Sequence, residues 1–160
     1  MNIDPDALAK SGTEHGHQTA LMQWVALTGK ALMSDLDMLF AVPNGGDRRL
    51  SVAAAMKAEG VRAGVPDLCW PVPHGVYFGL WIEMKRPELQ NRQGGGCTPE
   101  QLEWHSKLRT KGHAVVIAYG WKCAAWALRK YSAHQLHMPL ELEALRVTSV
   151  LLGNGDAAHR

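Results

Sequence analysis

The hydrophobic pattern of the chain predicts helices and strands in alternation. Apolar positions recur at helical spacing over residues 12–32 and again over residues 122–131. A segment rich in Ala and Met, residues 50–59, ends at Gly60 and predicts a short helix with a glycine cap. A fourth helix is predicted over residues 98–111, because it opens with an N-cap threonine, a proline in the first turn and a glutamine three residues after the threonine.

Four short apolar runs predict strands. They are rich in β-branched and aromatic residues, and turn signals rich in Pro and Gly separate them. The predicted strands are residues 38–42, 65–70, 76–84 and 114–119. Residues 86–97 carry three consecutive glycines and predict a mobile loop. The order of the elements favours an α/β or α+β domain in which helices flank a mixed central sheet.

The length of the chain favours a single folded domain. A chain of 160 residues has room for one hydrophobic core. We expect an N-terminal arm over residues 1–11, the folded domain over residues 12–131 and a C-terminal extension over residues 132–160. Within the extension, a short helix is predicted at residues 139–145.

The composition is that of an ordinary folded protein. Hydrophobic residues make up 46% of the chain and charged residues 20%, which argues against disorder. A formal net charge of +2 allows a polyanionic partner without requiring one. The three cysteines show no CxxC spacing and predict reduced thiols. We find no signal-peptide pattern and no apolar stretch of the ~18 residues that a membrane helix needs, so we expect a cytoplasmic protein without membrane contact.

Charged residues interrupt two of the predicted strands. Because side chains alternate across a strand, Glu83 and Lys85 share one face and Met84 takes the other. Folding the two strands about Gly75 places Asp67 opposite Glu83, and carboxylates so opposed repel each other. A divalent cation removes the repulsion, and two carboxylates suit Mg²⁺ or Mn²⁺. Lys85 beside this cation would hold an attacking water or stabilise negative charge on a phosphate.

A simpler interpretation makes Glu83 and Lys85 exposed charges on the wet face of an antiparallel sheet. A Glu-x-Lys sequence on a strand fits that interpretation best when it stands alone, and Pro66-Asp67 is by itself a common turn dipeptide. The two sequences together, on adjacent strands, favour a metal site for phosphodiester hydrolysis.

Pro66-Asp67 followed by Glu83-Met84-Lys85 resembles the motif of the PD-(D/E)xK nuclease superfamily. Four further motifs narrow this resemblance. They are ExxxQ at Glu14 and Gln18, PNGG at Pro43–Gly46 followed by Arg48, GVPD at Gly64–Asp67, and TPxQ at Thr98–Gln101. In this order they resemble the VRR-NUC family, the virus-type replication-repair nuclease domain, over residues 12–120.

The resemblance implies a restriction-endonuclease-like core and a metal-dependent DNA endonuclease. It implies that Asp67 and Glu83 bind Mg²⁺ or Mn²⁺, with the Met84 carbonyl and Glu14 as further candidate ligands. The implied catalytic residues are Asp67, Glu83, Lys85, Gln101 and Glu14. The resemblance also implies a phage or bacterial homodimer of replication, repair or recombination, which acts in the cytoplasm (the host's, if a phage encodes it). Its implied substrates are branched DNA, such as four-way (Holliday) junctions or flaps.

Polar and basic residues near the predicted active edge are candidates for binding DNA. They are Gln18, Asn44, Arg48, Arg49, Arg62, Arg86 and Arg92. Several candidates also have a purely structural interpretation. Glu14 fits a capping box with Ser11, and Gln101 fits one with Thr98, so that capping and catalytic roles both stay open at these positions.

Two other functions remain alternatives. One is a non-catalytic DNA-binding module on the same fold, although every expected catalytic position is filled. The other is a sequence-specific restriction-type endonuclease, although only a short tail is available for the extra recognition elements that such enzymes need. The chain contains no GxxxxGK[ST] sequence, so we expect no nucleotide cofactor.

Overall fold

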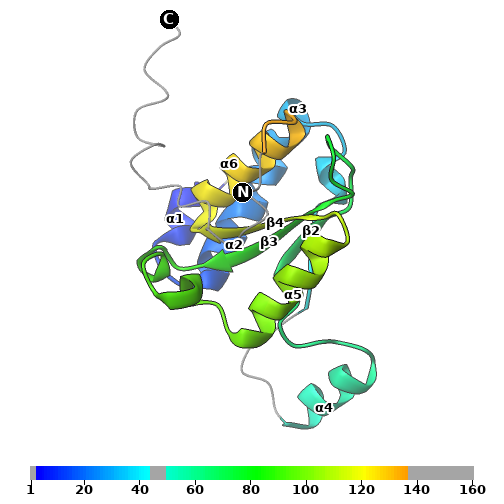
Figure 1. Ribbon diagram of the computed structural model, residues 1–160. Coiled ribbons are helices and arrows are strands. Elements are labelled where there is room, and N and C mark those ends of the chain that lie inside the picture. Colours follow the sequence, from blue (N-terminus) through cyan, green and yellow to red (C-terminus); the bar gives the residue numbers. More distant parts are fainter. Residues whose placement is uncertain (1–2, 44–49, 137–160) are drawn as a thin grey trace, which may run out of the picture.

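The computed structural model describes residues 3–43 and 50–136, and within them a four-stranded sheet lies between helices (Figure 1). The strands are β1 (Phe40–Ala41), β2 (Leu68–Trp70), β3 (Leu80–Lys85) and β4 (Ala114–Tyr119), and they stand in that order across the sheet. The pairs β1–β2 and β2–β3 are antiparallel, whereas β3 and β4 are parallel. The predicted mixed sheet flanked by helices is confirmed.

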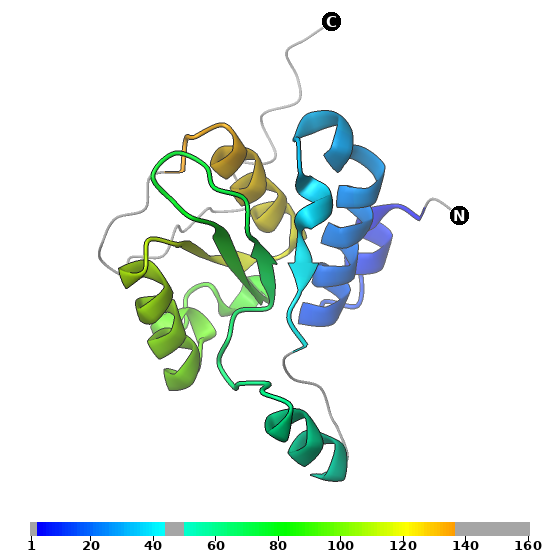
Figure 2. The same cartoon turned by 90° about the vertical axis from the view of Figure 1, so that its right-hand side faces the viewer.

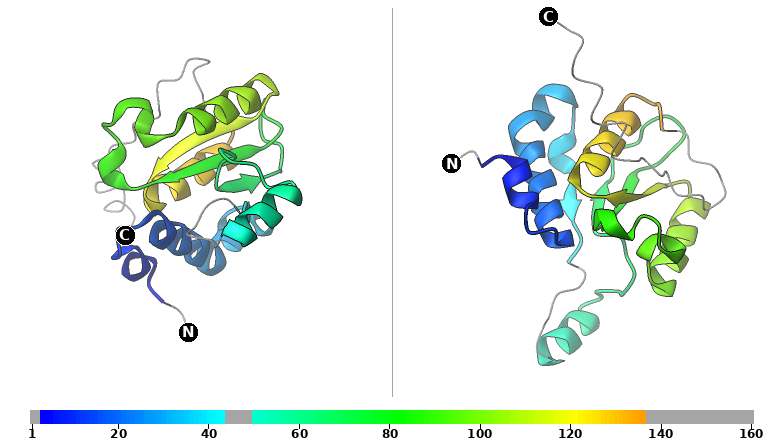
Figure 3. Two further views of the ribbon diagram at one scale, coloured as in Figure 1. Left: turned by 90° about the horizontal axis from the view of Figure 1, so that it is seen from below. Right: turned by 90° about the vertical axis from the view of Figure 1, so that its left-hand side faces the viewer.

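Helices cover both faces of this sheet. One face carries α2 (Glu14–Trp24) and α6 (Trp121–Ser132), and the opposite face carries α5 (Pro99–Thr110) (Figures 2 and 3). The helix α4 (Leu50–Ala58) projects beyond the end of the sheet. The remaining helical elements are α1 (Pro5–Ala9), a π-helical turn η1 (Val25–Gly29), α3 (Lys30–Leu32), and the short 3₁₀ turns η2 (Leu36–Met38), η3 (Pro87–Leu89) and η4 (Gln93–Gly96). No helix within residues 3–43 and 50–136 is long and apolar enough to cross a membrane.

The main hydrophobic core lies between the sheet and the pair α2–α6. Leu21 of α2 and Leu128 of α6 are fully buried there, together with Ile82 of β3. Met84, two residues beyond Ile82, faces the same core and is 1% exposed. Alternation along β3 therefore directs the intervening Glu83 to the other face, where α5 lies.

The predicted register between the second and third apolar runs is confirmed. Leu68 pairs with Ile82 and Trp70 pairs with Leu80, as folding about Gly75 requires. The ladder is shorter than predicted, because residues 71–79 form a loop in which His74 and Tyr77 make a single bridge. The predicted strand is therefore wrong over residues 76–79.

The predicted N-terminal arm contains the helix α1. Asp4 caps this helix by accepting a hydrogen bond from the Asp6 N–H, and Pro5 occupies its first turn. The helix packs against α2, and the Asp6 carboxylate accepts hydrogen bonds from Trp121 Nε1 and Lys122 Nζ, both at 3.0 Å. The described part of the arm is therefore a helix packed on the folded domain, because residues of α6 hold it.

The predicted mobile loop at residues 86–97 contains the two turns η3 and η4. Leu89 of η3 is 8% exposed and packs with Ile117 and Tyr119 of β4. Gly95 has a φ of +65°, and a Cβ there would collide with the Tyr119 hydroxyl, which donates a hydrogen bond to the Gly95 carbonyl. At this position glycine is thus required by the turn and by the close approach of Tyr119. The helix predicted at residues 139–145 lies outside the described residues.

Candidate functional site

Asp67, Glu83 and Lys85 lie together where β2 begins and β3 ends. Asp67 directly precedes β2, and the β2–β3 register continued by one residue sets it opposite Glu83. Asp67 Oδ2 accepts a hydrogen bond of 2.7 Å from the backbone N–H of Met84. The short strand β2 thus delivers the Asp67 carboxylate to the strand that carries the other two charges.

Glu83 and Lys85 are buried. Glu83 is 1% exposed and Lys85 is 5% exposed, on the sheet face that α5 covers. The interpretation of these residues as charges on a wet sheet face is therefore wrong. Their alternation with core residues is as predicted, but a helix covers the second face as well.

Three side chains donate hydrogen bonds to the Glu83 carboxylate. Lys85 Nζ lies 3.1 Å from Oε1, Gln101 Nε2 lies 2.5 Å from the same oxygen, and His105 Nε2 lies 3.3 Å from Oε2. A carboxylate offers about four acceptor positions, so these donors leave room for one further partner. A buried carboxylate with such partners is stabilised against the desolvation that burial imposes.

The start of α5 places Gln101 in this network. Thr98 Oγ1 accepts from the Gln101 N–H at 3.3 Å, and Gln101 Oε1 accepts from the Thr98 N–H at 2.9 Å, which makes the capping box. The same Gln101 side chain accepts from Lys85 Nζ at 3.2 Å and donates to Glu83. Capping and contact with the charged pair, open alternatives in the sequence, thus coexist in one side chain.

Glu14 approaches the site from α2. Thr13 caps this helix, so Glu14 is its first residue and does not occupy the third position that a capping box with Ser11 requires. Glu14 Oε1 lies 3.9 Å from Lys85 Nζ, at the limit of an ion pair. The alternative capping box at Ser11 is therefore wrong, and Glu14 faces the charged cluster.

The charges of the site change the pKa values of its members. Burial raises the pKa of Asp67 to about 7, and the negative charge of Glu83 adds to the increase. The Met84 N–H and the Lys85 ammonium oppose this increase without cancelling it. For Lys85, burial disfavours the ammonium, but the Glu83 carboxylate raises the pKa overall, so Lys85 keeps its positive charge.

A groove with a cavity volume of about 1010 Å³ opens over these residues. Asp67, Glu83 and Gln101 form one part of its lining, and Glu14 and Gln18 of α2 form another. The far side comes from α4 and the chain that follows it. Residues there include Met56, Lys57, Arg62 and Gly64.

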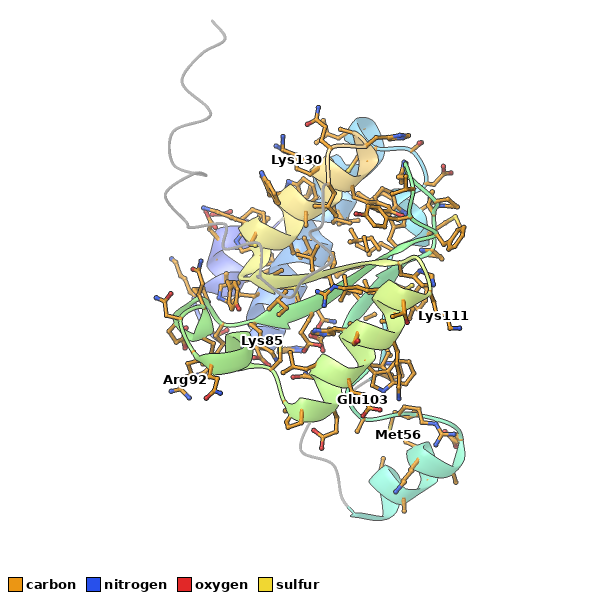
Figure 4. The ribbon with its side chains drawn as sticks, viewed as in Figure 1. Met56, Lys85, Arg92, Glu103, Lys111 and Lys130 are labelled. Atoms are coloured by element: carbon orange, nitrogen blue, oxygen red, sulfur yellow. The ribbon has the colours of Figure 1, made fainter. Side chains whose placement is uncertain are left out.

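The structure places only some of the predicted DNA-binding residues at the groove. Gln18 and Arg62 line the groove, whereas Arg86 and Arg92 are exposed on the 86–97 segment and do not line it. Arg86 Nη1 lies 3.3 Å from Glu88 Oε1. In Figure 4, Lys85 lies between β3 and the first turns of α5, whereas Arg92 lies at the outer edge of the molecule. Asn44, Arg48 and Arg49 lie outside the described residues.

His105 is a site residue that the sequence interpretation missed. It is fully buried on α5, four residues after Gln101, and it contacts the carboxylate that Gln101 also contacts. The spacing of four residues places both side chains on one face of the helix, which is the signal that was available in the sequence.

The two carboxylates suit an oxygen-preferring ion such as Mg²⁺ or Mn²⁺ better than a metal such as zinc that several histidines or cysteines hold. Within residues 3–43 and 50–136, no group of three or more His, Cys, Asp or Glu side chains is arranged to hold a metal ion. Mg²⁺ does not need such a group, because it commonly binds through one or two carboxylates and keeps waters or substrate phosphates as its other ligands. Asp67 and Glu83 could provide that donor set. Burial, and then the charge of Glu83, raise the pKa of Asp67, and a bound cation would offset both effects.

Comparison with known proteins agrees with this geometry. Residues 5–122 match the VRR-NUC domain family. The fold is similar to the solved structure of a VRR-NUC domain protein, with a TM-score of 0.59 and 29% sequence identity. That similarity covers 74% of this chain and 87% of the other. No curated protein matches the sequence.

Proposed function

Because the chain belongs to the VRR-NUC domain family and so carries a nuclease domain, we propose that it is a metal-dependent DNA endonuclease. It hydrolyses phosphodiester bonds and prefers branched DNA, such as four-way junctions or flaps, during replication, repair or recombination. The observation that carries this proposal is the charged pair Glu83–Lys85, buried beside Asp67 at a groove. Burying both charges costs free energy, and their use in phosphodiester hydrolysis explains why the site keeps them.

In this proposal Asp67 and Glu83 hold Mg²⁺ or Mn²⁺, and the Met84 carbonyl and Glu14 are further candidate ligands. When bound, the ion supplies Lewis-acid stabilisation of the phosphate and lowers the pKa of a bound water. The Met84 N–H holds Asp67 in place, and Gln101 and His105 hold Glu83, so the carboxylates are oriented before any ion arrives.

Lys85 has the role of the catalytic cation. Its ammonium group is buried and stays charged, and it lies 3.1 Å from Glu83 Oε1. A fixed positive charge in a site with little water stabilises the negative charge that develops on a phosphate oxygen during attack. Gln101, which contacts both Lys85 and Glu83, orients that ammonium and the attacking water.

The groove supports DNA as the substrate. Lys57 and Arg62 bring positive charge to its far side, and Gln18 adds a polar contact near the acids. Such contacts bind the backbone phosphates whatever the base sequence, and they weaken as the salt concentration rises. Arg86 and Arg92 extend the basic surface along the 86–97 segment, and Asn44, Arg48 and Arg49 are proposed contacts from outside the described residues.

We propose a homodimer, because two copies of the site would make paired cuts in a symmetric junction. Two observations support it. The helix α4 projects from the body of the molecule in Figures 1 and 2, and Val52 on it is 45% exposed. Light scattering at micromolar protein concentration should give twice the chain mass, and a monomer mass would contradict this part of the proposal.

We also propose that the protein acts in the cytoplasm of a bacterium, or of the host if a phage encodes it. The three cysteines are free thiols, and Cys69 and Cys123 are buried, which suits a reducing compartment.

A cleavage assay tests the proposed activity. Labelled four-way junction, flap and linear duplex DNA are incubated with the protein in Mg²⁺, Mn²⁺ or EDTA. We expect cutting in either metal, faster on branched DNA. Cutting should be lost in Asp67→Asn and should fall strongly in Lys85→Met. Lys107→Met is the matched control for Lys85→Met, because Lys107 is an exposed lysine on α5 that pairs with Glu103.

Two outcomes would contradict the proposal in different ways. Binding of DNA without cutting in any metal would favour a non-catalytic DNA-binding module. Cutting at one fixed sequence in linear duplex, with no preference for branches, would favour a restriction-type enzyme.

A further inference from the structure

His105 is the most deeply buried polar residue beside the site. Its exposed fraction is 0%, and it lies on the inner face of α5, one turn beyond Gln101. Its Nε2 atom is 3.3 Å from Glu83 Oε2, the carboxylate oxygen that neither Lys85 nor Gln101 contacts. Each oxygen of Glu83 thus has its own donor or donors.

The chemistry of this contact determines which nitrogen of His105 carries the proton. An ionised carboxylate has no hydrogen to donate, so in this contact Nε2 is the donor. The other nitrogen, Nδ1, is buried and has no hydrogen-bond partner among the residues that the structure describes. The polar contact that this imidazole makes in the described structure is therefore the one to Glu83.

We propose that His105 is a positioning residue, which holds Glu83 in the orientation that binds the divalent cation. With Oε1 held by Lys85 and Gln101, a donor at Oε2 prevents rotation of the carboxylate about its last bond. The acceptor position that remains then has a fixed direction. This inference rests on the proposed metal site, and it assigns a role to a residue outside the five motifs of the sequence.

A purely structural role makes a different prediction. If His105 only fills space between α5 and the sheet, any side chain of similar volume should preserve metal binding. If it acts as a donor, the position of the N–H group matters. A Gln side chain can place its amide nitrogen near the position of the histidine Nε2, whereas an Asn side chain is one carbon shorter and cannot.

Calorimetric titration of the whole protein with Mn²⁺, without DNA, separates these roles. Loss of an outer contact to a metal ligand typically weakens metal binding about 10–100-fold, and we expect that loss in His105→Leu and His105→Asn. We expect His105→Gln to recover most of the affinity. His17→Leu is the matched control, because His17 is a second buried histidine with an unpartnered Nδ1, on α2. Its Mn²⁺ affinity should equal that of the wild type.

The comparison of His105→Gln with His105→Asn keeps the test decisive if the leucine variant does not fold. Equal Mn²⁺ affinity in these two variants would overturn the inference, and so would a wild-type protein that binds no Mn²⁺. Failure of the proposed function is a separate result. If Mn²⁺ binding follows the expected pattern but no DNA is cut, the role of His105 stands and the nuclease proposal fails.

Discussion

The Asp67 carboxylate accepts a hydrogen bond of 2.7 Å from the backbone N–H of Met84, and this bond ties the beginning of β2 to the strand that carries Glu83. The two acids face each other because the backbone holds them there. Burial and the charge of Glu83 raise the pKa of Asp67 to about 7, so their proximity costs free energy whenever both are ionised and no cation is bound.

The first prediction concerns the stability of the metal-free protein. The pKa of Asp67 is about 7 when folded and 3.8 as its ordinary value, so the folded state binds more protons between these pH values. The free energy of unfolding contributed by Asp67 therefore falls as pH rises from about 4 to about 7. Asp67→Asn should remove this dependence and stabilise the protein at pH 8 in EDTA.

Urea denaturation from pH 4 to pH 8 in EDTA measures this effect. The wild type and Asp67→Asn should have similar stability at pH 4 and diverge towards pH 8. Parallel profiles across the whole range would contradict the raised pKa of Asp67.

The second prediction concerns pH and the metal. Protons and the cation compete for Asp67, so the Mg²⁺ concentration for half-maximal cutting should rise as the pH falls below about 7. The rate at saturating Mg²⁺ should change less, because the ion displaces the proton. Cleavage measured over a Mg²⁺ series at pH 6 and pH 8 tests this, and identical half-saturation values would contradict it.

The third prediction concerns Lys85. Lys85→Met keeps most of the side-chain length but removes the ammonium group, and we expect cutting to fall by about 10²–10³-fold. Stability should fall by about 3–5 kcal/mol, because Glu83 is left buried without its ion pair. The exposed control Lys107→Met should change stability by less than about 0.5 kcal/mol.

A double variant identifies the source of the predicted loss of stability in Lys85→Met. Adding Glu83→Gln to Lys85→Met removes the uncompensated charge, so it should recover stability without recovering cutting. If the double variant is as unstable as the sum of the single variants, the two side chains are not energetically coupled.

The fourth prediction concerns Gly64, at the edge of the groove. It has a φ of +84°, and a Cβ there would lie 2.6 Å from the backbone of Glu100 in α5. Gly60 has a φ of +103° with open space around it, so Gly60→Ala tests backbone strain alone, which costs about 1–3 kcal/mol. Gly64→Ala should cost more, and it should also weaken cutting, because α5 must move.

Urea denaturation of the two alanine variants, with the cleavage assay, measures this difference. Equal losses of stability would show that the contact between Gly64 and Glu100 carries no cost of its own.

The fifth prediction concerns the capping box of α5. Thr98→Ala removes the acceptor for the Gln101 N–H, and such a loss costs about 1 kcal/mol. Thr98→Ser keeps the hydroxyl and should retain stability. Because Gln101 also contacts Lys85 and Glu83, Thr98→Ala should reduce cutting as well. If Thr98→Ala cuts DNA as fast as the wild type, the cap at Thr98 is not needed to place Gln101 in the site.

Local rules predicted the register that brings Asp67 opposite Glu83. Alternation along β3 and the turn around Gly75 were sufficient, because a shift by one residue would turn Ile82 and Met84 away from the core that α2 and α6 cover. The same rules could not predict the burial of Glu83, which depends on α5 packing over the second face of the sheet.

The contacts of His105 and the Asp67–Met84 hydrogen bond were missed for a related reason. A sequence does not tell which backbone N–H a side chain will contact. The role of a lone histidine on a helix is likewise ambiguous until the strand that it faces is known. In the same way, the hydrogen bonds that Asp6 accepts from Trp121 and Lys122 join residues more than 100 positions apart, which no local pattern reveals.

The most direct test of the central claim is the position of Mn²⁺ in crystals of the protein grown or soaked with that ion. We predict one anomalous scattering peak in direct contact with carboxylate oxygens of both Asp67 and Glu83, and its disappearance in Asp67→Asn. A peak elsewhere on the surface, or none at saturating Mn²⁺, would contradict the claim that these two acids form a cation site.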